Sequence, residues 1–151
     1  MTTWTDEYEP LGKMQELLDE NWVEYIDVPK PTLQIVNDPD DAISRIDMWD
    51  NDYLLIAMPS PEQIRPRGNF VYHDRITQIL LTTATRVSRQ RMRNLYKEIR
   101  AICFMKKHVF PNWQLLRPIS YRELYGTDQN IWRGEYLVQL ENHAVLSETT
   151  I

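Results

Sequence analysis

Glycine and cysteine are both scarce in this chain of 151 residues, which has four glycines and a single cysteine, Cys103. Four glycines leave little material for a glycine-rich phosphate-binding loop, and the sequence has no such motif. A single cysteine excludes an internal disulfide framework, which fits a reducing compartment. Because Cys103 falls on the apolar side of an expected helix, we interpret it as a small core residue rather than a nucleophile.

The residue types that usually carry catalysis or metal binding lack the spacing that those functions need. The histidines, His73, His108 and His143, lie far apart and match no metal-ligand motif. Ser60 and Ser120 lack the G-x-S-x-G setting of a nucleophile elbow. We therefore expect no catalytic, cofactor-binding or metal site, and we expect that the protein is not an enzyme.

A metal-dependent nuclease is the enzyme class that the acidic residues come nearest to. Asp52 and Asp74 stand at the starts of two expected strands, and carboxylates on adjacent strands with a lysine are the minimum for metal-assisted phosphodiester cleavage. Neither strand supplies a nearby Glu-x-Lys, and prolines after Met58 interrupt the place where one is expected. The sequence therefore disfavours a nuclease.

Long apolar runs are also missing. No run approaches the length of about 20 residues that a membrane span needs, and residues 1–6 have neither the basic region nor the apolar core of a signal peptide. We therefore expect a protein that is made in the cytoplasm and is kept there or assembled there into something larger. We expect a mobile lead at residues 1–10, one domain at residues 11–145 and a tail at residues 146–151.

Charge is present in quantity, and it is unevenly distributed. The net charge is −5, which disfavours non-specific nucleic-acid binding by the whole surface. Residues 1–52 contain fourteen acids and three bases, whereas residues 86–107 contain eight bases and one acid, Glu98. The chain is thus acidic at its start and strongly basic in one later segment.

The basic segment has a helical rhythm. At about 100° per residue, five of its cations fall within about 80° of one another on a helical wheel: Arg89, Arg93, Lys97, Arg100 and Lys107. The adjacent sector is apolar and contains Met92, Leu95, Tyr96, Ile99, Ile102 and Cys103. We call the five cations the basic stripe, and with Arg86 they are candidates for a ring lumen or a subunit interface.

Hydrophobic periodicity and turn signals predict an α+β domain, with a mainly antiparallel sheet, one long helix on a face and an N-terminal helix. Ser88 is the expected N-cap of the long helix, and Pro111 stops anything beyond it. A turn at residues 37–41 is expected to cap a short helical segment through Trp49. Apolar residues on both faces of residues 72–85 place that strand in the middle of the sheet. Helix is also expected at residues 11–22, and strand at residues 32–36, 52–58, 72–85, 113–119 and 132–141.

Residues 59–68 contain three prolines and a glycine, so we expect a loop there. A loop of this length inside a compact domain is often an assembly contact, with Arg65 and Arg67 as its candidates. The chain's five tryptophans and eight tyrosines could stack on bases. The positions of several of them favour a core or a protein interface instead: Trp22, Tyr96, Trp132 and Tyr136.

Residues 50–141 resemble a known family. The resemblance is carried by residues 50–56, the Pro-Arg-Gly sequence at 66–68, residues 74–83, Ser88-Arg89, the helix segment 95–102 and the closing segment 132–140. In order, these are a strand, a threonine-rich turn with Ser-Arg, a long helix, and a final strand with an aromatic and charged opening. This pattern is similar to the tail terminator (tail-completion) proteins of archaeal tailed viruses and long-tailed phages.

The resemblance implies a virion subunit that is assembled in the host cytoplasm. Members of that family are small α+β proteins that close into a hexameric ring on the tail tube. Their ring halts tube growth, gives head-side neck proteins a docking surface, and lets the genome pass through its lumen. The implied partners are therefore further copies of the chain, the tail-tube protein, head-side neck or connector proteins, and DNA in non-specific contact, with no membrane.

Three other interpretations stay open at this point. The protein could be another head–tail connector or head-completion adaptor of the same virus type. It could be a nucleic-acid-binding module unrelated to virions, whose DNA binding would fall steeply with salt. The basic stripe could also be a solvated helix face that the chain's own acids neutralise in part.

Overall fold

The structure is a computed structural model, and it describes residues 10–22, 25–45, 51–67, 72–106, 115–126 and 130–145. The expected tail and all of the expected lead except Pro10 lie outside these ranges. The elements, in chain order, are α1 (Pro10–Asn21), β1 (Thr32–Ile35), α2 (Pro39–Arg45), β2 (Tyr53–Ala57), β3 (Gln63–Arg67), β4 (Tyr72–Thr85), α3 (Arg89–Met105), β5 (Leu115–Gly126) and β6 (Ile131–Val145).

The strands form a mixed sheet of six strands, in the order β1-β2-β4-β6-β5, with β3 paired to part of β4. The β1–β2 pair is parallel, and the other four strand pairs in the described residues are antiparallel. Strand β4 pairs with β6 along its whole length, from Tyr72 opposite Val145 to Thr85 opposite Trp132. The predictions of an α+β fold and of a central strand at residues 72–85 are confirmed.

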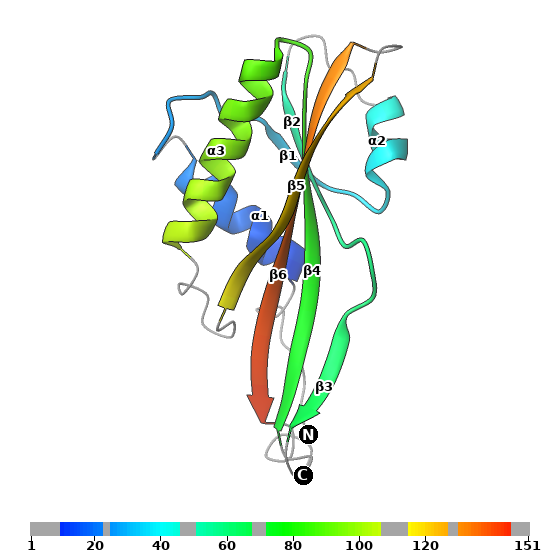
Figure 1. Ribbon diagram of the computed structural model, residues 1–151, viewed down its shortest axis with the longest axis vertical. Coiled ribbons are helices and arrows are strands. Elements are labelled where there is room, and N and C mark those ends of the chain that lie inside the picture. Colours follow the sequence, from blue (N-terminus) through cyan, green and yellow to red (C-terminus); the bar gives the residue numbers. More distant parts are fainter. Residues whose placement is uncertain are drawn as a thin grey trace.

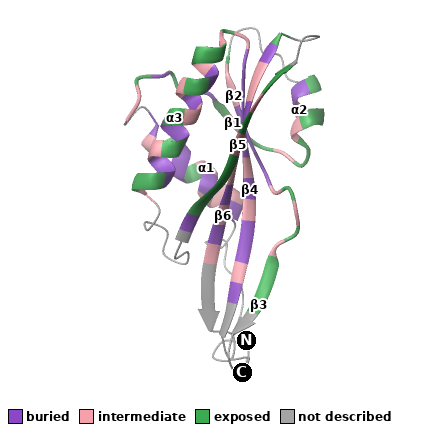
Figure 2. Ribbon diagram, viewed as in Figure 1, coloured by how far each residue is buried: buried purple, intermediate pink, exposed green. Residues whose placement is uncertain are grey.

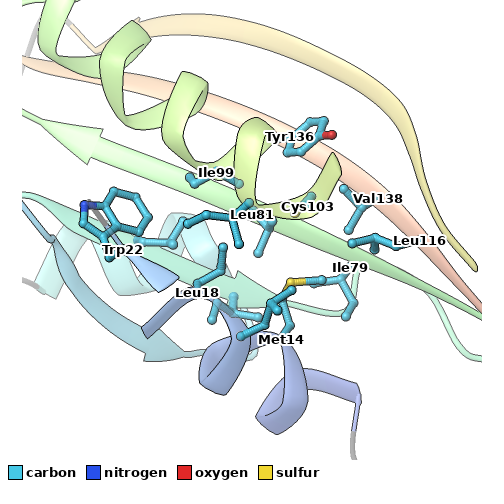
Figure 3. Close-up of a cluster of buried hydrophobic side chains, with 14 of the residues drawn as sticks. Met14, Leu18, Trp22, Ile79, Leu81, Ile99, Cys103, Leu116, Tyr136 and Val138 are labelled. Atoms are coloured by element: carbon cyan, nitrogen blue, oxygen red, sulfur yellow. The ribbon is translucent and has the colours of Figure 1, made fainter. Parts of the chain in front are cut away.

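The helices cover both faces of this sheet. In Figure 1, α1 and α3 lie on one side of it and α2 lies on the other. The larger core joins α1 and α3 to the sheet through Leu18, Ile99, Leu81 and Val138, among others (Figure 3). A smaller cluster joins Ile43 of α2 to Leu55, Ala84 and Ile131 on the opposite face. Burial on both faces accounts for the continuous apolar character of β2 and for the apolar residues on both faces of β4.

Helix α3 begins where the sequence predicts. The hydroxyl of Ser88 accepts a hydrogen bond from the N–H of Arg91 at 3.0 Å, which satisfies one of the free donors at the helix start. The expected apolar sector of α3 faces the core, since Leu95, Ile99 and Ile102 are fully buried. Figure 2 shows the opposite side of α3, and most of β5, as exposed.

Two predictions about the elements are wrong in part. The predicted loop at residues 59–68 contains β3, whose Pro66 is tolerated because this strand pairs on one side only, with β4. The predicted strand at 113–119 continues to Gly126, because a bulge between Pro118 and Ser120 breaks the period-2 pattern by which strands are recognised. The short helical segment expected after the turn at residues 37–41 is present as α2 (Pro39–Arg45), so with α1 and α3 the described residues contain three helices around the sheet.

Glu98, the one acid of the basic segment, is fully buried. Its carboxyl group accepts hydrogen bonds from the backbone N–H groups of Tyr25 at 3.4 Å and Ile26 at 2.5 Å. The indole N–H of Trp22 donates to the carbonyl oxygen of Val28 at 3.0 Å in the same segment. Glu98 therefore holds the chain that follows α1 against α3, across more than seventy residues of sequence.

We predict that Glu98→Ala lowers the free energy of unfolding by about 1–3 kcal/mol, because it leaves two partly buried N–H groups without their acceptor. Glu98→Gln keeps one acceptor oxygen and should lose less. Urea denaturation of the two variants and the parent chain checks the order. An alanine variant as stable as the parent would contradict this role.

Candidate functional site: the basic stripe and the adjacent groove

The structure places four residues of the basic stripe together on the exposed side of α3. These are Arg89, Arg93, Lys97 and Arg100. The fifth, Lys107, lies outside the described residues. Arg86 is half-buried in the turn between β4 and α3, and it makes contacts within the chain. The wheel therefore predicted the arrangement of the four helical cations correctly.

The first two cations of the stripe are paired within the chain. Arg93 donates to both carboxylate oxygens of Glu123, at 3.0 and 3.1 Å, and Arg89 donates to the same carboxylate at 3.2 Å. The hydroxyl of Tyr121 adds a third donor at 3.2 Å. Because Glu123 lies on β5, this cluster connects the start of the long helix to the edge of the sheet.

The charges within this cluster stabilise one another. Hydrogen bonding to Arg93, followed by that to Arg89, holds the pKa of Glu123 below its ordinary value, although partial desolvation works against it. The same pairing raises the pKa of the Arg93 guanidinium. Burial, followed by the charge of Glu123, raises the pKa of the Tyr121 hydroxyl, so that group remains a donor. The carboxylate of Glu123 and the guanidinium of Arg93 therefore stay charged near neutral pH.

An aromatic block lies beneath the stripe. The ring of Tyr121 stacks on that of Tyr96, with centroids 3.6 Å apart, and Tyr136 meets Tyr96 edge-on at 5.2 Å. Gly134 makes room for this packing, because a Cβ atom there would lie 2.9 Å from the Tyr121 hydroxyl and 2.8 Å from the hydroxyl of Thr83. Tyr96 and Tyr136 pack within the chain, as the interpretation of these two as core or interface residues predicts. Trp22 and Tyr136 are buried, which confirms that interpretation for them.

The second half of the stripe lies beside an apolar groove. The groove has a volume of about 740 Å³ and runs between α3 and β5. Cys103, Tyr136 and Leu116 contribute to it where α3 lies against the sheet (Figure 3). Its other lining residues are Ile26, Lys97, Arg100, Ala101, Phe104, Arg117 and Pro118. Burial raises the pKa of the Cys103 thiol to about 12, so this cysteine is an inert lining group rather than a nucleophile.

Lys97 and Arg100 differ from Arg89 and Arg93 in their pairing. Neither forms an ion pair with any residue that the structure describes. Arg100 lies over the ring of Tyr96, 5.6 Å from its centroid. The side chains of Lys97 and Arg100 are exposed and line the groove. Phe104 next to them is 67% exposed and Met105 is 59% exposed. The stripe is therefore divided into a half that Glu123 pairs and a half that borders apolar surface.

The remaining candidates lie on the other side of the sheet's centre. Arg65 is exposed on β3, and Arg67 is the last residue of that strand. All five residues of β3 pair with the first residues of β4. They are thus strand residues rather than loop residues, and they are not brought together with α3. Sequence reasoning did not identify Glu123, although the alternation of Tyr121 and Glu123 is the local signal that β5 continues past its bulge.

The described residues contain neither a metal-binding cluster nor a membrane-spanning helix. No group of three or more His, Cys, Asp or Glu side chains in them is placed to hold a metal ion. Among their helices, none combines the length and the apolar character that crossing a membrane requires.

The Glu123 cluster predicts a specific pH dependence. A carboxyl group whose pKa is depressed by folding adds stability above its ordinary value of 4.5 and loses it as the pH falls through the folded-state value. Glu123→Gln should therefore lower the melting temperature at pH 7 by about 1–4 °C, and the difference from the parent should shrink toward zero in acid. Thermal melts from pH 3 to pH 8 measure this. Glu16→Gln, which alters an exposed pair with Lys13 at 3.6 Å, is the control, and its melting temperature should differ little from that of the parent. A melting-temperature difference for Glu123→Gln that stays constant across the pH range would contradict the prediction.

Comparison of the chain with protein-family models and with curated proteins finds no match. The site is thus defined by its own geometry: an apolar groove between α3 and β5, two cations at its border that no described residue pairs, and a neighbouring cation pair that Glu123 neutralises.

Proposed function

We propose that this protein is a virion structural subunit of the tail-terminator kind. Copies of the chain close into a ring, with six members in the family that it resembles, on the end of the tail tube. The ring stops tube growth, docks the head-side neck proteins and surrounds the passing genome. The protein carries no catalytic function in this proposal, and it acts in the tail and neck region of the particle after assembly in the host cytoplasm.

The observation that supports the proposal best is that Lys97 and Arg100, which no described acid pairs, border an apolar groove. Phe104 in the lining of this groove is more than half exposed, and so is Met105, the last residue of α3. A contiguous apolar patch with charged residues at its rim is the usual composition of a surface that another macromolecule covers. An assembling subunit needs such a surface, whereas an isolated soluble protein gains nothing from one.

Protein is a better partner than DNA for this surface. Phosphate recognition requires cations but no apolar groove, and the stripe's two cations nearest the start of α3 are already paired with Glu123. Contact with passing DNA is then confined to weak, non-specific attraction, which suits a channel because tight binding would hinder passage. The groove itself is assigned to another protein surface in the assembled particle.

Electron microscopy of the purified protein mixed with tail tubes of the same virus tests the proposal. We expect a ring at one end of each tube, and tubes of limited length when the protein is present during tube polymerisation. Tubes polymerised without it should be uncapped and of variable length. Binding to the head portal with no tube capping would favour the head–tail connector alternative instead.

Retention on DNA provides the complementary measurement. The proposal expects weak retention that disappears at moderate salt, with no dependence on sequence. Strong binding to DNA by single copies, together with no ring on tubes, would contradict the proposal and favour a nucleic-acid-binding module.

A further inference from the structure

The two edges of the sheet carry complementary surfaces. In the strand order, β1 forms one edge of the main path and β5 forms the other. The β5 edge carries the groove, Lys97 and Arg100. The β1 edge carries a shallow hollow of about 500 Å³ between β1 and α2, whose lining includes Ile35, two acids, Asp38 and Asp41, and one base, Arg45. The groove is therefore apolar and cationic at its border, and the hollow is partly apolar with more acids than bases.

The two acids in the first turn of α2 are exposed and already paired. Asp41 lines the hollow and pairs with Arg45 at 3.2 Å, whereas Asp40 is directed toward β6 and pairs with Arg133 at 2.7 Å; the two Asp side chains are 51% and 79% exposed. Exposed pairs of this kind contribute little and exchange readily with other partners. Ile35, which is 41% exposed, lies in the same hollow and supplies an apolar side chain for contact.

Strand-to-strand addition is disfavoured at the β5 edge. Pro118 lies in this strand and lacks an N–H group, and the register shifts between Pro118 and Ser120. Strand β1 has only four residues to offer in return. A partner at the β5 edge therefore docks through side chains, and the groove between α3 and β5 is the concave surface for that contact.

We infer that these two edges are the two halves of a head-to-tail contact between copies of this chain. The groove of one copy receives Ile35 and the acidic β1–α2 surface of the next, so that Lys97 and Arg100 face Asp40 and Asp41. Because the surfaces lie at opposite edges of one sheet, each copy uses both at once, which is the requirement for a ring. The inference rests on the proposed ring and supplies the contact that closes it.

Charge reversal on each edge separately, followed by mixing, tests this contact. We choose K97E/R100E for the groove and D40K/D41K for the acidic edge. Asp38 is left in place because its carboxylate accepts from the N–H of Asp40 at 3.0 Å and caps α2. Either variant alone places like charges across every contact, so its self-association, measured by sedimentation at low salt, should be at least tenfold weaker than that of the parent chain.

An equal mixture of the two variants should restore association. In a ring where the two variants alternate, the acidic groove of K97E/R100E meets the basic edge of D40K/D41K, and the basic groove of D40K/D41K meets the acidic edge of K97E/R100E. Opposite charges therefore face each other at every contact. A ring with an even number of copies admits this alternation, and the fourfold variant that carries all the substitutions should also associate. Circular dichroism of each variant checks its fold. If a charge reversal unfolds the chain, the neutral variants K97Q/R100Q and D40N/D41N are used in its place, and a smaller loss of self-association is expected.

The outcomes separate this contact from the proposed function. Restoration in the mixture supports the contact, because misfolded subunits cannot rescue one another. Variants that associate like the parent, or a mixture no better than its components, overturn it. A parent chain that stays monomeric at every concentration overturns it too, while capping of tail tubes still decides the proposed function on its own. If tubes are capped and the charge swap fails, the ring stands and is closed by other surfaces.

Discussion

The arrangement of the molecule depends on the pairing of strand β4. This strand of 14 residues pairs with β6 along its whole length, with β2 over Leu80–Ala84 and with β3 over Tyr72–Ile76. Such a strand has neighbours on both sides and must be covered on both faces where its apolar residues point outward. Helices α1 and α3 supply one cover and α2 the other. The two edges of the sheet, where we place the contacts between copies, are consequences of this central pairing.

Two glutamates decide what helix α3 presents to the outside. Glu98 lies on the buried side and holds the backbone of Tyr25 and Ile26, so the one acid of the basic segment does not neutralise the exposed stripe. Glu123 comes from β5 and pairs Arg89 and Arg93. Lys97 and Arg100, at the border of the groove, are the exposed cations of the stripe that no described acid pairs. The charge counted from the sequence of this segment is therefore larger than the unneutralised charge on the surface of α3. The pairing with Glu123 leaves that unneutralised charge at the border of the groove.

Local patterns were sufficient to predict much of this fold. The apolar sector of α3, its Ser88 cap and the two-faced strand at residues 72–85 all follow from short-range periodicity, and the structure confirms them. Ion pairs and strand pairs between residues far apart in the sequence could not be predicted from such local patterns. Glu123 lies thirty residues from Arg93 on a strand whose alternation is broken by a bulge, and β3 is hidden in a proline-rich segment. The parallel pairing of β1 with β2 also follows from no local signal.

The central claim is that the groove between α3 and β5 is a contact surface between subunits and not a lumen lining. A cryo-electron microscopy map of the assembled ring on its tube tests this most directly. We expect Lys97 and Arg100 to be covered by the β1–α2 edge of the neighbouring copy, and Arg89 and Arg93 to stay paired with Glu123 of their own copy. A map in which the groove is open to the lumen or to solvent would contradict it.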